Sequence, residues 1–353
     1  MRNHWMQPKA GTIQPTLMGG VVVAAAIAAG VAAFFLFDPQ RPISPLGPEY
    51  SYDLSEYIEI DPDLILYEQT GEPFATGLSQ SRVIVVGPHD TVWVAGDKQI
   101  RRFSPDGKPL RTLDCEGEPT CLAIDNDGRL YVGLIDHIVV FDASGALSAQ
   151  WPKPHADALL TSLAVLGESV FAEEAGDKTI LRYDKNGTLV MQFGQPDPDR
   201  HHPGFLLPSP FGFNLAAAPD GLLRVVNPGR HLIEAWTIDG HREWWWGTSS
   251  VRVEGFSGCC NPSALALLPN SHYITSEKGL IRVKEYDDQG RFVGVVAGPK
   301  QLDWVGPLRV YESPQGAHVR GFGVAADTAG RVYVLDVFRN TVRVFERIKN
   351  LSN

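Results

Sequence analysis

The residues with the strongest metal-binding chemistry are two adjacent pairs and one single histidine. Cys259 and Cys260 occur together in FSGCCNP, and His201 and His202 occur together in QPDPDRHHPG, with His318 further along the chain. Thiolates and imidazoles are ligands that zinc and copper prefer, so convergence of these side chains would make a metal or redox site. Their spacing does not show convergence, and paired histidines in a proline-rich loop are commonly only solvated. No CxxCH motif is present, so covalently attached haem is not indicated.

The same cysteines have a second chemistry, disulfide formation. Cys115 and Cys121, in LDCEGEPTC, are close enough in sequence to close a small loop, and the adjacent Cys259 and Cys260 would form a strained vicinal disulfide. Disulfides persist in an oxidising compartment, so this prediction depends on the chain facing away from the cytoplasm. We therefore predict no cofactor, with zinc or copper at the adjacent cysteines as the alternative.

A repeat of about 40 residues positions all of these side chains. Residues 125–151 show it most plainly: Asp127 and Gly128 form a tight turn, residues 130–133 and 137–141 are two strands, and a second turn leads into a third. Six copies align, each with an aromatic residue in its third strand: Phe103, Phe141, Tyr183, Trp236, Tyr286 and Phe345. Four strands per repeat at this period predict an all-β, six-bladed β-propeller over residues 56–350.

The last copy lacks its outer strand, because the repeat stops at residues 345–348. Residues 64–76, LILYEQTGEPFAT, precede the first full blade and resemble the end of one. We predict that they complete the last blade and close the ring. The alternative is an unpaired strand beside an open sheet edge.

The repeat pattern resembles that of the NHL-repeat family of six-bladed β-propellers. Residues 327–345, DTAGRVYVLDVFRNTVRVF, match the pattern best, and the resemblance covers residues 79–347. It implies the fold and says little about function, because the family includes scaffolds, RNA binders and a few lyases. No functional residue is carried over from the repeat.

Enzymatic activity is not favoured. Gluconolactonase-like propellers hold a metal in a cage of Glu, Asn and Asp at the starts of inner strands. The corresponding positions here depart from that cage at most places: they are Thr120, Ser162, Asn214, Ser263 and Phe322. No Ser-His-Asp or paired-carboxylate arrangement can be identified from spacing.

The propeller topology directs attention to the fifth blade. The connection between blades and the loop between second and third strands lie on the same face, so Cys259, Cys260 and Asn261 should lie near Glu277 and Lys278. We predict this face as a binding or metal site. The plainer interpretation is that Glu277 and Lys278 are a solvated pair.

Three consecutive tryptophans form the outer strand of the fourth blade. Alternation sends Trp244 and Trp246 to one face of the strand and Trp245 to the other. Exposed aromatic rings of this kind mark interfaces, so we predict an interaction surface here. The alternative is that all three rings pack between blades.

An apolar segment precedes the propeller. Residues 17–37, LMGGVVVAAAIAAGVAAFFLF, are long enough to cross a bilayer, which takes about 20 residues. The basic residues before this segment predict that residues 1–16 are cytoplasmic and that the propeller is periplasmic. A cleaved signal peptide is the alternative, although the phenylalanines at residues 34, 35 and 37 are bulky where a cleavage site needs small residues.

Small residues recur along one side of the expected membrane helix: they are Gly20, Ala24, Ala28 and Ala32. Such a stripe permits close approach of another helix, which predicts a dimer or a subunit of a larger membrane complex. The alternative is ordinary alanine-rich composition. Residues 38–55 are rich in proline and predict a stiff spacer between the helix and the propeller.

The net charge disfavours two classes of partner. Residues 1–37 contain two of the 31 basic residues and none of the 41 acidic ones, so the remainder carries a net charge of −12. Nucleic acid and anionic lipid are therefore poor partners for the propeller. The sequence predicts a non-catalytic, membrane-anchored scaffold that binds other membrane protein subunits. The alternative is a metal-binding, redox or lyase module on the face with Cys259 and Cys260.

Overall fold

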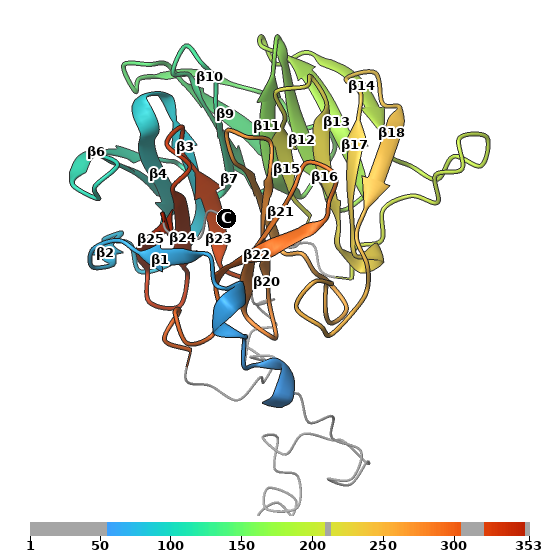
Figure 1. Ribbon diagram of the computed structural model, residues 1–353. Coiled ribbons are helices and arrows are strands. Elements are labelled where there is room, and N and C mark those ends of the chain that lie inside the picture. The colour runs from blue at the N-terminus through green and yellow to red at the C-terminus, as the bar shows by residue number, and fades with distance from the viewer. Residues whose placement is uncertain (1–54, 209–212, 305–320, 350–353) are drawn as a thin grey trace, which may run out of the picture. The chain divides into compact units, whose positions relative to one another are not determined.

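The computed structural model describes residues 55–208, 213–304 and 321–349, and these form an all-β, six-bladed propeller (Figure 1). Within each blade all paired strands are antiparallel. Blade 1 is β3 (Ser81–Gly87), β4 (Thr91–Gly96), β5 (Gln99–Phe103) and β6 (Pro109–Asp114). Blade 2 is β7 (Pro119–Ile124), β8 (Leu130–Leu134), β9 (His137–Phe141) and β10 (Leu147–Gln150). Blade 3 is β11 (Leu160–Leu166), β12 (Ser169–Glu174), β13 (Thr179–Asp184) and β14 (Leu189–Phe193).

The remaining blades follow the same order. Blade 4 is β15 (Leu215–Ala217), β16 (Leu223–Asn227), β17 (Leu232–Trp236) and β18 (Arg242–Trp246). Blade 5 is β19 (Ala264–Leu267), β20 (Tyr273–Glu277), β21 (Arg282–Tyr286) and β22 (Phe292–Ala297). Blade 6 contains β23 (Gly323–Ala326), β24 (Val332–Asp336) and β25 (Thr341–Arg347). Short 3₁₀ turns complete the described elements: η2 (Ser55–Tyr57), η3 (Pro62–Leu64), η4 (Pro88–Asp90) and η6 (Pro228–Arg230).

The ring is closed by strands from the N-terminal side of the propeller. β1 (Tyr67–Gln69) and β2 (Phe74–Ala75) both pair with β25, so the predicted completion of the last blade is confirmed (Figure 1, blue against red). The six inner strands contact one another in cyclic order, from β3 through β7, β11, β15 and β19 to β23 and back to β3. The ring of inner strands is therefore closed, although each blade remains a separate sheet.

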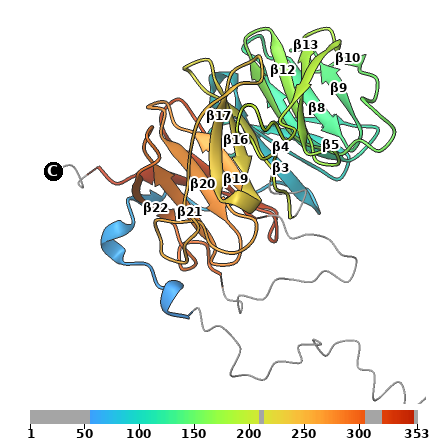
Figure 2. The ribbon, with the colours of Figure 1, turned by 90° about the vertical axis from the view of Figure 1, so that its right-hand side faces the viewer.

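The segment before β1 lies against blade 5. The backbone N–H of Leu66 donates to the carbonyl of Val295 at 3.0 Å, and Arg282 Nη2 donates to the carbonyl of Tyr57 at 2.6 Å (Figure 2). These contacts fix the point where the chain enters the propeller.

The aspartates of the repeat organise its tight turns. Asp142 Oδ1 accepts from the backbone N–H of Ala146 at 3.0 Å, and Asp184 Oδ1 accepts from that of Thr188 at 2.8 Å. A glycine with positive φ completes each of these turns, at 77° for Gly145 and 90° for Gly187. The aspartate therefore supplies the acceptor and the glycine the left-handed backbone, which explains the DxxG spacing of the repeat.

The core lies between blades. The six aromatic residues that align in the third strands are all buried, with relative exposure of 6% or less. Trp151, at the end of blade 2, packs between Tyr131 and Tyr183, with ring centroids 5.8 and 5.3 Å apart. A Cβ atom at Gly187 would lie only 2.5 Å from the Trp151 ring. Each interblade contact thus depends on side chains from two consecutive repeats.

Several predicted features fall outside the described residues. These are the membrane helix at residues 17–37 with Gly20, Ala24, Ala28 and Ala32, almost all of the spacer at residues 38–55, and His318. Among the residues that are described, no helix has both the length and the apolar character needed to span a bilayer.

Candidate functional site

The described residues around the central channel offer little that could do acid-base or metal chemistry. It has a volume of about 320 Å³ and is lined by the inner strands of all six blades. Its described lining is apolar or hydroxyl-bearing apart from Asn214, Cys121 and the charged Arg82.

The hydroxyl groups at the starts of inner strands connect neighbouring strands through hydrogen bonds. Thr120 Oγ1 donates to the carbonyl of Gly133 at 3.0 Å, and Ser263 Oγ donates to that of Ser276 at 3.1 Å. Ser162 Oγ accepts from the backbone N–H of Leu215, in the next blade, at 2.9 Å. These three hydroxyl groups therefore help to hold the inner strands in place.

The adjacent cysteines lie on the connection from blade 4 to blade 5 and are not joined. Cys259 is exposed and Cys260 is buried, and their Sγ atoms are 3.4 Å apart, whereas a disulfide bond is about 2.05 Å long. Burial raises the pKa of the Cys260 thiol, and the neighbouring Lys278 ammonium partly offsets this effect. Cys115 and Cys121 are not at bonding distance either, so the structure does not support the predicted disulfides.

Asn261 joins the two loops that the sequence placed together on the fifth blade. Its Nδ2 donates to the carbonyls of Ser257 at 2.6 Å and Lys278 at 2.8 Å, and its Oδ1 accepts from the backbone N–H of Lys278 at 2.9 Å. The amide therefore holds the β20–β21 turn against the cysteine-bearing connection. Its hydrogen-bonding capacity is used by the fold.

Glu277 is fully buried, so it does not form a solvated pair with Lys278. Its Oε1 accepts from the backbone N–H of Ser257 at 3.0 Å, and its Oε2 lies 3.3 Å from Lys284 Nζ and 3.8 Å from Arg282 Nη1. Burial lowers the pKa of Lys284 to about 8, against the opposing attraction of Glu277. Lys284 also donates to the carbonyl of Val253 at 3.0 Å. This buried ionic cluster holds the blade 4–5 connection in place.

The predicted histidine ligands lie elsewhere, on the connection from blade 3 to blade 4. His201 is exposed, and its Nδ1 lies 3.1 Å from the carbonyl of Pro198. His202 is buried against Trp236, with ring centroids 4.7 Å apart, and its Nε2 lies 3.4 Å from Glu234 Oε2. No contact among the described residues joins either histidine to the cysteine pair. The predicted mixed Cys and His site is therefore not assembled by these residues.

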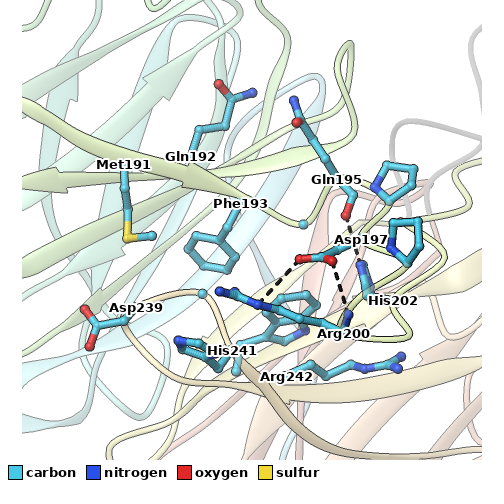
Figure 3. A pocket seen from close by; sticks show the side chains of 15 residues that line it. Met191, Gln192, Phe193, Gln195, Asp197, Arg200, His202, Asp239, His241 and Arg242 are labelled. Atoms are coloured by element: carbon cyan, nitrogen blue, oxygen red, sulfur yellow. Dashed lines mark hydrogen bonds and ion pairs between the residues drawn. The ribbon is translucent and has the colours of Figure 1, made fainter.

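A groove of about 480 Å³ lies between the outer strands of blades 3 and 4 (Figure 3). Its walls are the end of β14, the blade 3–4 connection around residues 194–202, and the β17–β18 turn at residues 239–242. Asp197 Oδ2 lies 3.5 Å from Arg200 Nε on one side, and Phe193 and Trp236 are the aromatic residues of the lining. Both polar and apolar groups are thus available to a bound chain.

The three tryptophans of β18 have three different environments. Trp246 is buried, with its ring 4.8 Å from Tyr286, and Trp244 is half-buried beneath the Arg224 guanidinium at 4.8 Å. Trp245 is 53% exposed, and the Arg242 guanidinium lies 4.1 Å from its ring centroid. The alternation expected from the sequence is present, and it leaves one large ring on the surface.

Arg242 connects this ring to the groove. Its Nη2 donates to the carbonyl of His201 at 3.0 Å, and its Nη1 lies 3.6 Å from Glu234 Oε1. A cation stacked on an aromatic face is stabilised by about 0.5–1 kcal/mol at an exposed site. The Trp245 ring is therefore held by stacking on Arg242, and Arg242 also lines the groove.

Sequence reasoning missed three features. One is the groove, and the second is a cluster of His155, Glu174 and Asp177 at the connection from blade 2 to blade 3. The third is the fully buried Glu173 in β12. The pair EE within the apolar run SVFAEE was the available signal for the last two, because acidic residues in a buried strand need a reason.

Comparison with known proteins supports the fold. No protein-family model and no curated protein sequence matches the chain. A streptogramin B lyase structure aligns with a TM-score of 0.52 and 10% identity over 82% of this chain and 100% of that one. A catalytically inactive virginiamycin B lyase from Staphylococcus aureus with quinupristin aligns with a TM-score of 0.53 and 11% identity, over 80% of this chain and 100% of that one.

A protein of unknown function from Bacteroides thetaiotaomicron VPI-5482 aligns at a TM-score of 0.55 and 12% identity, over 79% of this chain and 75% of that one. Identities this low show a shared propeller fold alone. These comparisons do not confirm the expected membership of the NHL-repeat family.

Proposed function

We propose that this chain is a non-catalytic recognition subunit, tethered to a membrane by residues 17–37, whose periplasmic propeller binds another membrane protein. The observation that carries this proposal is the exposed Trp245, supported by Arg242 at 4.1 Å beside a groove of about 480 Å³. Tryptophan and arginine are enriched at the energetic centres of protein interfaces.

The chemistry of the surface supports protein as the ligand. The groove combines an aromatic floor at Phe193 and Trp236 with charged walls at Asp197, Arg200 and Arg242. A binding region with an apolar centre and a polar edge is the usual anatomy of a protein interface. The net charge of −12 outside residues 1–37 argues against nucleic acid.

The central channel supports the non-catalytic part of the proposal. In its described lining, the hydroxyl groups of Thr120 and Ser263 already donate to backbone carbonyls, and the charged side chain is Arg82. General acid-base catalysis needs a titratable group within hydrogen-bond reach of a substrate.

The test is isolation of the full-length protein from its native membrane in mild detergent, with tryptophan variants. Trp245→Ala is expected to lose a stoichiometric partner that the wild type retains, because truncation of a central aromatic typically costs 2 kcal/mol or more of binding, about a thirtyfold change in affinity. The matched control is Leu147→Ala in β10, which removes a side chain of similar exposure, 54%, from the edge of another blade.

Equal recovery of the partner with the wild type and with Trp245→Ala would contradict the proposed surface. A full-length protein that is always recovered alone would contradict the scaffold function itself. Extraction with alkaline carbonate tests the tether separately, because a protein anchored by residues 17–37 stays with the membrane pellet.

A further inference from the structure

Three potential metal ligands meet where blade 2 connects to blade 3. His155 lies on the connection between β10 and β11, Glu174 ends β12, and Asp177 lies in the β12–β13 turn. One ligand atom from each lies within 4.8 Å of the other two. The repeat places both segments on the same face of the propeller, but on loops separate from the cysteines and from the groove.

The distances fit a small divalent ion. His155 Nε2 lies 3.5 Å from Glu174 Oε2 and 3.7 Å from Asp177 Oδ2. Ligand atoms bound tetrahedrally at 2.0–2.1 Å from zinc are separated by about 3.4 Å. The Asp177 side chain is 58% exposed, so its carboxylate can move toward the other two ligands without movement of the core.

The imidazole supplies an independent observation. His155 Nε2 is buried from solvent and, within the described part of the chain, has no hydrogen-bond partner. Buried polar atoms are normally satisfied, and an exception needs an explanation such as an ion that completes the site. This nitrogen faces two carboxylates, and a cation between them would satisfy all three groups.

Glu174 is already held in position for such an ion. Its Oε1 accepts from the backbone N–H groups of Leu159 at 2.8 Å and Gly176 at 2.9 Å, and its Oε2 accepts from that of Asp177 at 2.6 Å. A Cβ atom at residue 176 would approach Oε1 to 2.9 Å, so glycine allows this close turn. Each carboxylate oxygen has two acceptor sites, so Oε2 keeps one for a cation.

We propose that His155, Glu174 and Asp177 bind one divalent transition-metal ion, with zinc as the best fit. One imidazole nitrogen and two carboxylate oxygens form a three-ligand set that zinc accepts, and a fourth position is left for water or an external donor. Calcium and magnesium fit less well, because they prefer all-oxygen sites with six or more ligands.

The test is zinc titration of the full-length protein, purified without a histidine tag and stripped of metal, by isothermal calorimetry at pH 7. The wild type should bind one zinc per chain. His155→Ala and Asp177→Asn should each weaken binding at least about tenfold, because each removes a direct ligand. The matched control is His201→Ala, which removes an exposed loop histidine and should leave zinc binding unchanged.

The cysteine pair must be separated from this site. Replacement of both Cys259 and Cys260 by serine should leave the zinc stoichiometry and affinity unchanged. Cobalt substitution gives a second readout: visible d–d absorption without the near-ultraviolet thiolate band expected for a cysteine ligand.

Two outcomes would overturn the proposal. One is an absence of stoichiometric zinc binding, and the other is binding that persists in both His155→Ala and Asp177→Asn. The metal-free variants should have the same thermal unfolding midpoint as the metal-free wild type. This control shows that a loss of zinc binding is not caused by a loss of fold. Asp177→Asn keeps the size of an exposed side chain, so it preserves the test if the histidine variant unfolds.

Discussion

Glu173 makes the stability of this propeller dependent on pH. Its side chain lies in β12 on the same face as Phe171, which packs in the apolar contact between blades 3 and 4. It is fully buried, and neither carboxylate oxygen has a hydrogen-bond partner within the described residues. Burial therefore raises the pKa of Glu173 well above its usual value of 4.5.

The sign of the effect follows from proton linkage. Above pH 4.5 the unfolded chain releases the Glu173 proton while the folded chain retains it, so the free energy of unfolding falls as pH rises. The slope is about 1.4 kcal/mol per pH unit until pH passes the folded pKa. Glu173→Gln removes this slope, so the variant should gain up to about 2.7 kcal/mol relative to the wild type between pH 5 and pH 7.

The assay is urea unfolding followed by tryptophan fluorescence at pH 5, 6 and 7. Because every other titrating group is shared, the difference between Glu173→Gln and wild type isolates this carboxyl group. Glu116→Gln, at an exposed position, is the control and should show no pH-dependent difference. If the wild-type and Glu173→Gln stabilities keep a constant difference across this range, the assignment of a buried, protonated carboxyl group is refuted.

Three further predictions concern the turns, the buried ion cluster and the thiols. In urea unfolding, Gly187→Ala should destabilise the fold by about 2 kcal/mol more than Gly221→Ala. Both glycines have a positive φ, but of the two only Gly187 packs against a tryptophan ring. Equal losses of stability in the two variants would contradict this packing. Glu277→Gln should lower the free energy of unfolding by about 3–5 kcal/mol, since it leaves two buried cations unbalanced, and a loss below 1 kcal/mol would show that the cluster is solvated. At pH 8, Cys259 should react with iodoacetamide faster than Cys260, whose thiol is buried and has a raised pKa. Peptide mass mapping at early times measures the order of labelling, and earlier labelling of Cys260 would contradict this prediction.

Much of the fold was predictable because its signals are local. The DxxG turns, the aromatic residue in each third strand and the alternation within strands all act within one repeat. The incomplete last repeat and residues 64–76 then predicted which segments must pair, and the pairing of β1 and β2 with β25 confirms it. The same alternation placed Trp245 on the opposite face of the strand from Trp244 and Trp246, and the structure shows that Trp245 is the exposed ring.

The candidate sites were less predictable. The sequence placed Cys259, Cys260, Asn261, Glu277 and Lys278 together on the fifth blade, and the structure brings these loops into contact. Nothing in the sequence indicated that Glu277 would be buried and paired with two cations. These cations are Arg282 and Lys284 on the neighbouring strand β21, and only the folded blade brings them to Glu277.

The sequence by itself determined the number of blades, their order and the strand that closes the ring, because turn residues and period-two alternation act over a few neighbouring residues. Only the tertiary structure decided that His202 packs on Trp236 while His155 faces Glu174 and Asp177. Loops on one face of a propeller can meet or remain apart according to blade twist and side-chain packing. These depend on contacts between repeats, which sequence spacing does not encode.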